Sequence, residues 1–268
     1  MRLILSVFAV VLIAAPAFAA QTPWQELAPG VKARLISADA ASAEGTTMIA
    51  LELDMPPDFK TYWRVPGETG IATTIDWTGS NGITAAEMLW PYPIVETKAG
   101  YVDFVYYGPT VLPIRITLAG EGAEIETAIL MGICSDICVP ATASFSLALD
   151  LRTPDRGQGL RINQALALIP REWPGEPQPV GDIWWDAEAG ALAVAVSDPA
   201  VDPASLIASP ADASVLFGAP QKSPEPGIIF LPLLGKDEVK GLASQVIQVT
   251  FKADGEAFEV LRQLVERN

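Results

Sequence analysis

The chain has 268 residues, half of them hydrophobic, and its 17 basic and 32 acidic residues give a net charge of −15. So acidic a surface repels phosphate backbones and anionic lipids, which argues against nucleic acid and membrane surfaces as partners. The chain has no histidine and only two cysteines. Serine–histidine catalysis, cysteine–histidine catalysis and metal sites built on histidine are therefore excluded.

Residues 1–20 have the pattern of a secretory signal. Arg2 supplies the positive start, Leu3 to Ala15 are almost all apolar, and Ala17-Phe18-Ala19 is a small-x-small cleavage site. The apolar run of about 13 residues is short for a bilayer span, and no later stretch approaches the roughly 18 residues needed. We therefore expect an exported, soluble, periplasmic protein that is not inserted in the membrane after cleavage, in a compartment that permits disulfides.

The segment 21–153 is predicted to form a β-sandwich. Short apolar runs alternate with polar residues and are separated by glycine, proline, asparagine and aspartate. Their spacing favours a sandwich over a helical fold. The predicted strands are Thr46–Asp54, Thr73–Trp77, Tyr101–Tyr107, Leu112–Leu118, Glu124–Met131 and Ala143–Leu151.

Residues 154–180 are predicted to be a proline-rich linker, with a brief helix at Asn163–Ile169. A second β-sandwich is expected over residues 181–268, with a loop at Asp198–Pro210 and a hairpin turn at residues 253–256. The mature length of about 248 residues suits two such domains. The expected strands of this half are Asp182–Asp186, Ala191–Ser197, Ala213–Phe217, Gly227–Leu231, Gln245–Lys252 and Ala257–Val265, the last of which is alternatively a short helix.

Cys134 and Cys138 are the first candidates for reactive residues, and their sequence context leaves four interpretations open. A structural disulfide would close a loop of about five residues, worth about 2 kcal/mol against about 4.7 for 100 residues. A redox-active pair is the second interpretation, although Asp136 is anionic and no basic residue in the loop stabilises a thiolate. A Cu(I) site would use Met131 with both cysteines. In the fourth, both thiols are passive and binding occurs elsewhere.

Several motifs in order resemble the N-terminal periplasmic domain of the DsbD family, closest to the branch of ScsB, named for suppression of copper sensitivity. The resemblance covers roughly residues 30–152 and extends more loosely over the second half. It rests on residues 62–67 (YWRVPG), 76–80 (DWTGS), 90–93 (WPYP), 100–101 (GY) and 134–140 (CSDICVP).

The resemblance implies two immunoglobulin-like sandwiches, the first of which holds a redox cysteine pair between adjacent strands. It implies that Cys138 forms mixed disulfides with partners and that Cys134 resolves them. Tyr62 and Trp63 would lie near the pair, with Asp136 in its loop. The cap loop of the better-known branch carries a phenylalanine that this chain lacks, and Tyr101 is the candidate substitute.

The predicted function is thiol–disulfide exchange, of the protein-disulfide reductase type, without a cofactor. The expected partners are proteins with thioredoxin-like or membrane redox domains. Because the chain ends at Asn268 without a membrane domain of its own, we expect a separate membrane transporter to supply electrons. The alternatives are a periplasmic copper-binding or copper-tolerance protein and an interaction module with a structural disulfide.

Overall fold

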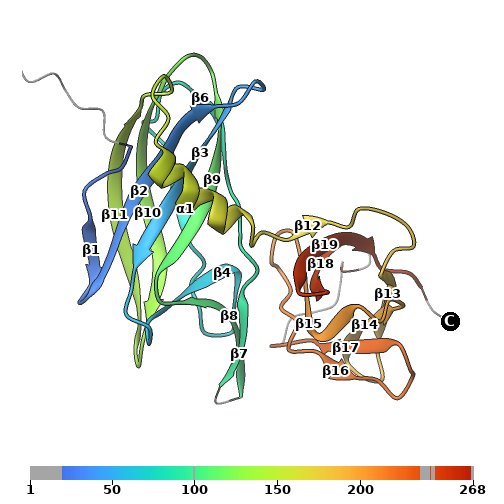
Figure 1. The fold of residues 1–268 in the computed structure, drawn as a ribbon. Coiled ribbons are helices and arrows are strands. Elements are labelled where there is room, and N and C mark those ends of the chain that lie inside the picture. Colours follow the sequence, from blue (N-terminus) through green and yellow to red (C-terminus); the bar gives the residue numbers. More distant parts are fainter. Residues whose placement is uncertain (1–19, 99, 236–241, 243–244, 267–268) are drawn as a thin grey trace, which may run out of the picture.

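The computed structural model describes residues 20–98, 100–235, 242 and 245–266 (Figure 1). The predicted signal, residues 1–20, lies outside these residues except for Ala20. Nearly all the described elements are strands, and they form two pairs of packed sheets, which confirms the predicted all-β class. None of the helices in the described ranges is long and apolar enough to cross a membrane.

The first pair of sheets forms the blue-to-green half of Figure 1. One sheet has the order β1-β2-β3-β9-β6 and the other β11-β10-β4-β8-β7, with β5 paired to β10. All their strand pairs are antiparallel, as in immunoglobulin-like sandwiches. The strands are β1 (Gln25–Ala28), β2 (Val31–Ala41), β3 (Thr46–Asp54), β4 (Lys60–Gly67), β5 (Thr74–Asp76), β6 (Ile83–Met88), β7 (Ile94–Lys98), β8 (Tyr101–Tyr107), β9 (Thr110–Leu118), β10 (Ala123–Cys134) and β11 (Cys138–Leu149).

The alternation of side chains along β10 determines which residues enter the core. Ile125, Ile129, Met131 and Ile133 are buried between the two sheets, whereas the even-numbered residues 124–130 are exposed on the outer face. Trp63 from β4 and Phe104 from β8 meet edge to face in this core, with ring centroids 5.9 Å apart. The expected strands of this half are confirmed, but the sequence interpretation missed β1, β2, β4, β6 and β7, which complete the sheets.

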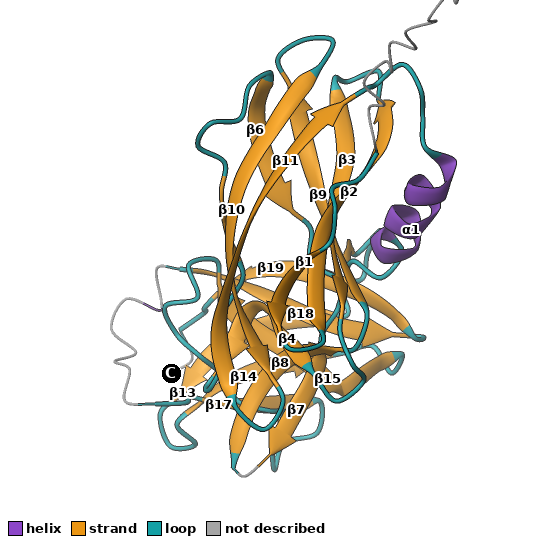
Figure 2. Ribbon diagram, turned by 90° about the vertical axis from the view of Figure 1, so that its left-hand side faces the viewer, coloured by secondary structure: helices purple, strands orange, loops and turns teal. Residues whose placement is uncertain are grey.

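The predicted linker at residues 154–180 contains a helix, as expected, but α1 spans Arg156–Leu166 and so begins seven residues before the predicted Asn163–Ile169. The side chain of Asp155 caps it by accepting a hydrogen bond of 2.9 Å from the Gln158 amide. Ile162 is buried with Ile36 and Ala50 on the outer face of the first sheet. Figure 2 shows α1 lying alongside β2, β3 and β9, so it belongs to the first sandwich.

The second pair of sheets forms the orange-to-red half of Figure 1, around a core of its own. Its sheets have the orders β12-β19-β18-β15 and β13-β14-β17-β16. Only the short β12–β19 pairing is parallel. The strands are β12 (Arg171–Glu172), β13 (Val180–Asp186), β14 (Ala191–Val196), β15 (Val201–Pro210), β16 (Gln221–Lys222), β17 (Ile228–Pro232), β18 (Val246–Ala253) and β19 (Glu256–Gln263).

Two expectations for this half are wrong. The predicted loop at Asp198–Pro210 is mostly strand β15, because a register shift between Asp202 and Ile207 lets the strand carry a proline. The predicted strand at Ala213–Phe217 contributes only an isolated bridge from Phe217 to Leu233. The turn before β19 is as predicted, with positive φ at Asp254 and Gly255.

The two sandwiches pack against each other. Ile207 from β15 joins the core cluster of the first sandwich. Arg64 on β4 forms an ion pair with Glu259 on β19, and the Tyr92 hydroxyl donates a 2.5 Å hydrogen bond to the Ser205 carbonyl. The contact therefore combines an apolar centre with polar links.

Candidate functional site

The cysteine pair closes the β10–β11 hairpin. The strand register sets Cys134 directly opposite Cys138, and the two sulfurs form a disulfide with the Cα atoms 4.1 Å apart. Residues 135–137 make the turn, in which the Ser135 amide donates to the Ile137 carbonyl at 3.3 Å. Cys134 is fully buried, whereas Cys138 is exposed. The two sulfur-bearing residues are therefore unequally accessible to a partner.

Period-two alternation places the disulfide on the outer face of its sheet. Met131 is three positions from Cys134, so its side chain points to the opposite face and is buried in the main core. Cys134 instead belongs to a small cluster with Tyr62 and Val105. The structure does not bring the three sulfurs of the predicted Cu(I) site together. In the ranges described, no three side chains of the histidine, cysteine, aspartate and glutamate types are grouped to hold a metal.

Tyr62 touches both sulfurs. Its hydroxyl oxygen lies 2.8 Å from Cys134 Sγ and 3.3 Å from Cys138 Sγ. Since a disulfide carries no proton, the phenol is the donor. The side chain is fully buried, and burial raises the pKa of Tyr62, which keeps its hydroxyl protonated. Its neighbour Trp63 points the other way, into the core, and does not border the pair.

The ring of Tyr62 lies between two glycines. A Cβ on Gly70 would come within 2.2 to 2.7 Å of ring carbons along one edge. A Cβ on Gly132 would come within 3.0 Å of the other edge. The Gly132 amide also donates to the Ile71 carbonyl at 3.2 Å, which ties the loop after β4 to β10. The two glycines thus leave the ring little room to move.

A buried polar network adjoins the ring. The Lys60 ammonium forms an ion pair with Glu96, lies 3.5 Å from Asp103 Oδ2 and sits 5.7 Å from the centroid of the Tyr62 ring. The Tyr107 hydroxyl donates to Glu96. Burial alone would lower the pKa of Lys60, but the bond to Glu96 and the nearby charges raise it overall. Lys60 and Tyr107 likewise hold the pKa of Glu96 low despite its burial.

Sequence reasoning missed this network. Lys60 is 36 residues from Glu96 and 43 from Asp103, and none of the three stands in a recognisable motif. The only available signal was Lys60 itself, a charged residue two positions before Tyr62.

Two other predicted site residues lie at the surface. Tyr101 is the first residue of β8, at the end of the β7–β8 hairpin, and is 52% exposed. It lies six residues, or about 20 Å along the strand, from Tyr107, the residue of β8 that belongs to the polar network beside Tyr62. That position does not make it a cover for the disulfide. Asp136 is exposed in the turn between the cysteines. Next to it, Ile137 is 74% exposed and forms an apolar tip with Val139.

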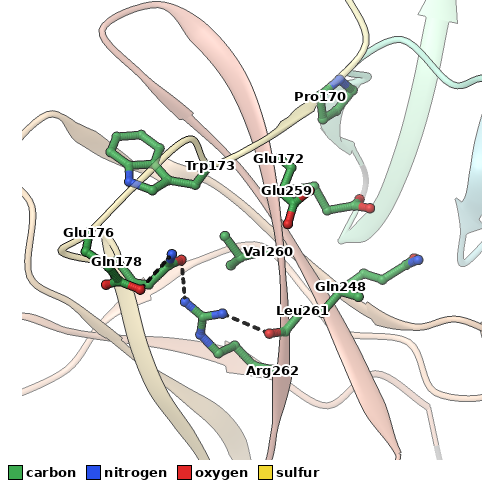
Figure 3. A pocket seen from close by; sticks show the side chains of 10 residues that line it. All are labelled: Pro170, Glu172, Trp173, Glu176, Gln178, Gln248, Glu259, Val260, Leu261 and Arg262. Carbon is green, nitrogen blue, oxygen red and sulfur yellow. Dashed lines mark hydrogen bonds between the residues drawn. The ribbon is translucent and has the colours of Figure 1, made fainter.

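The second sandwich has a separate cavity of about 610 Å³ between the segment after β12 and strand β19 (Figure 3). The guanidinium of Arg262 donates to Gln178 and to the backbone carbonyls of Val180, Gly181 and Leu261. These bonds hold β13 beside β19. The lining contains no sulfur and does not include any residue of the disulfide site.

Residues 32–150 match the sequence profile of the family described as thiol:disulfide interchange protein DsbD, N-terminal. No curated protein matches the chain. Among solved structures, the crystal structure of the N-terminal periplasmic domain of ScsB from Proteus mirabilis aligns with a TM-score of 0.71 and 22% identity. The alignment covers 93% of this chain and 100% of that one, so both sandwiches share its fold.

Proposed function

Residues 32–150 form a domain of the DsbD N-terminal family, and on this premise we propose that the chain is a periplasmic protein that passes electrons by thiol–disulfide exchange. Cys134 and Cys138 are the catalytic residues. The partners are proteins with thioredoxin-like or membrane redox domains, and a membrane electron transporter supplies the reducing equivalents. The reaction needs no cofactor, because both electrons are carried in the sulfur–sulfur bond.

The unequal burial of the two cysteines is the observation that carries this proposal. An incoming thiolate must approach a disulfide sulfur directly, and only the residue Cys138 is exposed to it. An exposed cysteine beside an apolar tip is suited to a partner protein that docks there and attacks the disulfide. The Ile137 side chain beside Cys138 offers the kind of contact that a protein partner buries.

The exchange then follows from the geometry. A partner thiolate bonds to Cys138 Sγ, the Cys134–Cys138 bond breaks, and its electron pair leaves on Cys134 as a thiolate. The Tyr62 hydroxyl, 2.8 Å from that sulfur, donates to the developing charge. The partner's second thiol releases the mixed disulfide, which leaves this chain with two thiols. In the opposite direction, Cys138 attacks an acceptor disulfide and Cys134 resolves the intermediate.

The test is a redox titration of the mature protein against glutathione, together with trapping by single variants. In Cys134→Ser, Cys138 is expected to form a stable mixed disulfide with glutathione. In Cys138→Ser, the buried Cys134 is expected to react much more slowly. A potential well above about −300 mV supports exchange, whereas a pair that stays oxidised far below that value is a structural staple and refutes it.

A further inference from the structure

We propose that Lys60 is a positioning residue for the exchange reaction, whose positive charge offsets Glu96 and Asp103 and so allows Cys134 to leave as an anion. The inference rests on the proposed function and deepens it. It assigns a role to a side chain that lies outside the cysteine motif and against the ring of Tyr62.

Lys60 is placed for this role by strand pairing. It is the register partner of Cys134 across β4 and β10, on the same outer face of the sheet. Its ammonium lies 5.7 Å from the centroid of the Tyr62 ring, and the hydroxyl of that ring touches Cys134 Sγ at 2.8 Å. Lys60, Tyr62 and Cys134 therefore form one continuous buried contact.

The charges around this contact are unequal. Lys60 is one positive charge between two carboxylates, and the side chains of all three are at most 16% exposed. The carboxylates are held in place by other donors: Tyr107 bonds to Glu96, and Thr69 bonds to Asp103 at 2.5 Å. Without Lys60, two negative charges with little access to water would face the site. Like charges disfavour a further anion, and the effect is strong where water is excluded.

Exchange creates such an anion. When a thiolate attacks Cys138, the electron pair of the broken bond goes to Cys134 Sγ, which takes up a proton only afterwards. Disulfide opening is faster when the leaving sulfur is a more stable anion. With Lys60 in place, the network carries one net negative charge; without it, the network carries two. Lys60 thus stabilises the anion that forms on Cys134 Sγ when the disulfide opens.

The test compares opening of the disulfide by dithiothreitol at pH 7 in four variants. Lys60→Met is expected to slow opening roughly three- to tenfold, and Lys60→Arg to restore the rate. Glu96→Gln, which removes a negative charge, is expected to speed it. Lys32→Met is the matched control, because Lys32 is an exposed lysine on β2 whose partner is Asp54.

A second readout separates this role from a merely structural one. Alkylation of Cys134 by iodoacetamide in the Cys138→Ser background, followed against pH, is expected to move to higher pH in Lys60→Met and to lower pH in Glu96→Gln. If Lys60→Met fails to fold, the shift of the alkylation profile to lower pH in Glu96→Gln still tests the inference. Equal rates and pH profiles in wild type, Lys60→Met and Glu96→Gln overturn the inference. A wild-type disulfide that dithiothreitol does not open overturns the proposed function instead.

Discussion

Gly70→Ala tests the claim that the position of Tyr62 depends on free space beside its ring. The added Cβ would lie 2.2, 2.4 and 2.7 Å from three ring carbons, closer than any carbon contact allows. The ring is fully buried and its other edge lies against Gly132, so neither side gives way easily. The φ of Gly70 is not in the left-handed region, so alanine is excluded by crowding and not by its backbone conformation.

Overpacking of this kind costs about 1–3 kcal/mol. We therefore expect urea unfolding to show that loss in Gly70→Ala. The displaced hydroxyl loses its contact with the sulfurs, and at about 1.5 kcal/mol or more for a hydrogen bond to a charged acceptor the opening of the disulfide slows at least about tenfold. Gly120→Ala is the matched control, because a Cβ there meets nothing within 4 Å. It is expected to be neutral or to gain about 0.4–1 kcal/mol.

The result that refutes the reasoning is a Gly70→Ala protein as stable as Gly120→Ala, with an unchanged rate of disulfide opening. Such a result would mean that the loop after β4 moves freely and does not clamp Tyr62. A loss of stability without a change in the rate of disulfide opening would confirm that the Tyr62 ring is crowded. It would refute the role of the Tyr62 hydroxyl in the opening.

Three further predictions concern the Tyr62 hydroxyl, the buried tyrosines and the contact between the two sandwiches. Tyr62→Phe keeps the ring and removes the donor to Cys134; dithiothreitol is expected to open the disulfide at least about tenfold more slowly, since bonds to charged acceptors are worth about 1.5–3 kcal/mol, and an unchanged rate would count against the donor. Burial raises the pKa of Tyr62 and Tyr106, so the stability they contribute is complete below pH about 10 and is lost above it; urea unfolding at rising pH checks this, and a flat profile contradicts it. Ile207→Ala is expected to lose about 2–5 kcal/mol, against less than about 0.5 for the exposed Leu261→Ala, and similar losses would show that the sandwiches do not share a core.

The central features of the β10–β11 hairpin that carries the cysteines were predictable from the sequence. Alternation in Glu124–Met131 and Ala143–Leu151 indicates two strands, and the short stretch between them must turn. Residues 134 and 138 then lie opposite each other on one face, because three turn residues separate them. Alternation is a local property, so neighbouring residues carry it without reference to the rest of the fold.

The same alternation explains one error among the site residues. Tyr62 and Trp63 are adjacent in sequence, and the resemblance suggested that both lie near the pair. In a strand, neighbours point to opposite faces, so only one of them can meet the sulfurs. The sequence interpretation had no strand at Lys60–Gly67, so it had no basis for choosing between the two.

By itself, the sequence predicted the all-β class and two successive groups of strands, because these follow from local periodicity and turn residues. It left the bonding of the two cysteines open, and the structure shows the disulfide. Only the tertiary structure decided what surrounds the disulfide. Lys60, Glu96 and Asp103 come from three strands, and Gly70 reaches Tyr62 from a loop. Such contacts depend on how whole strands align in a sheet, and side-chain packing across distant segments sets that alignment.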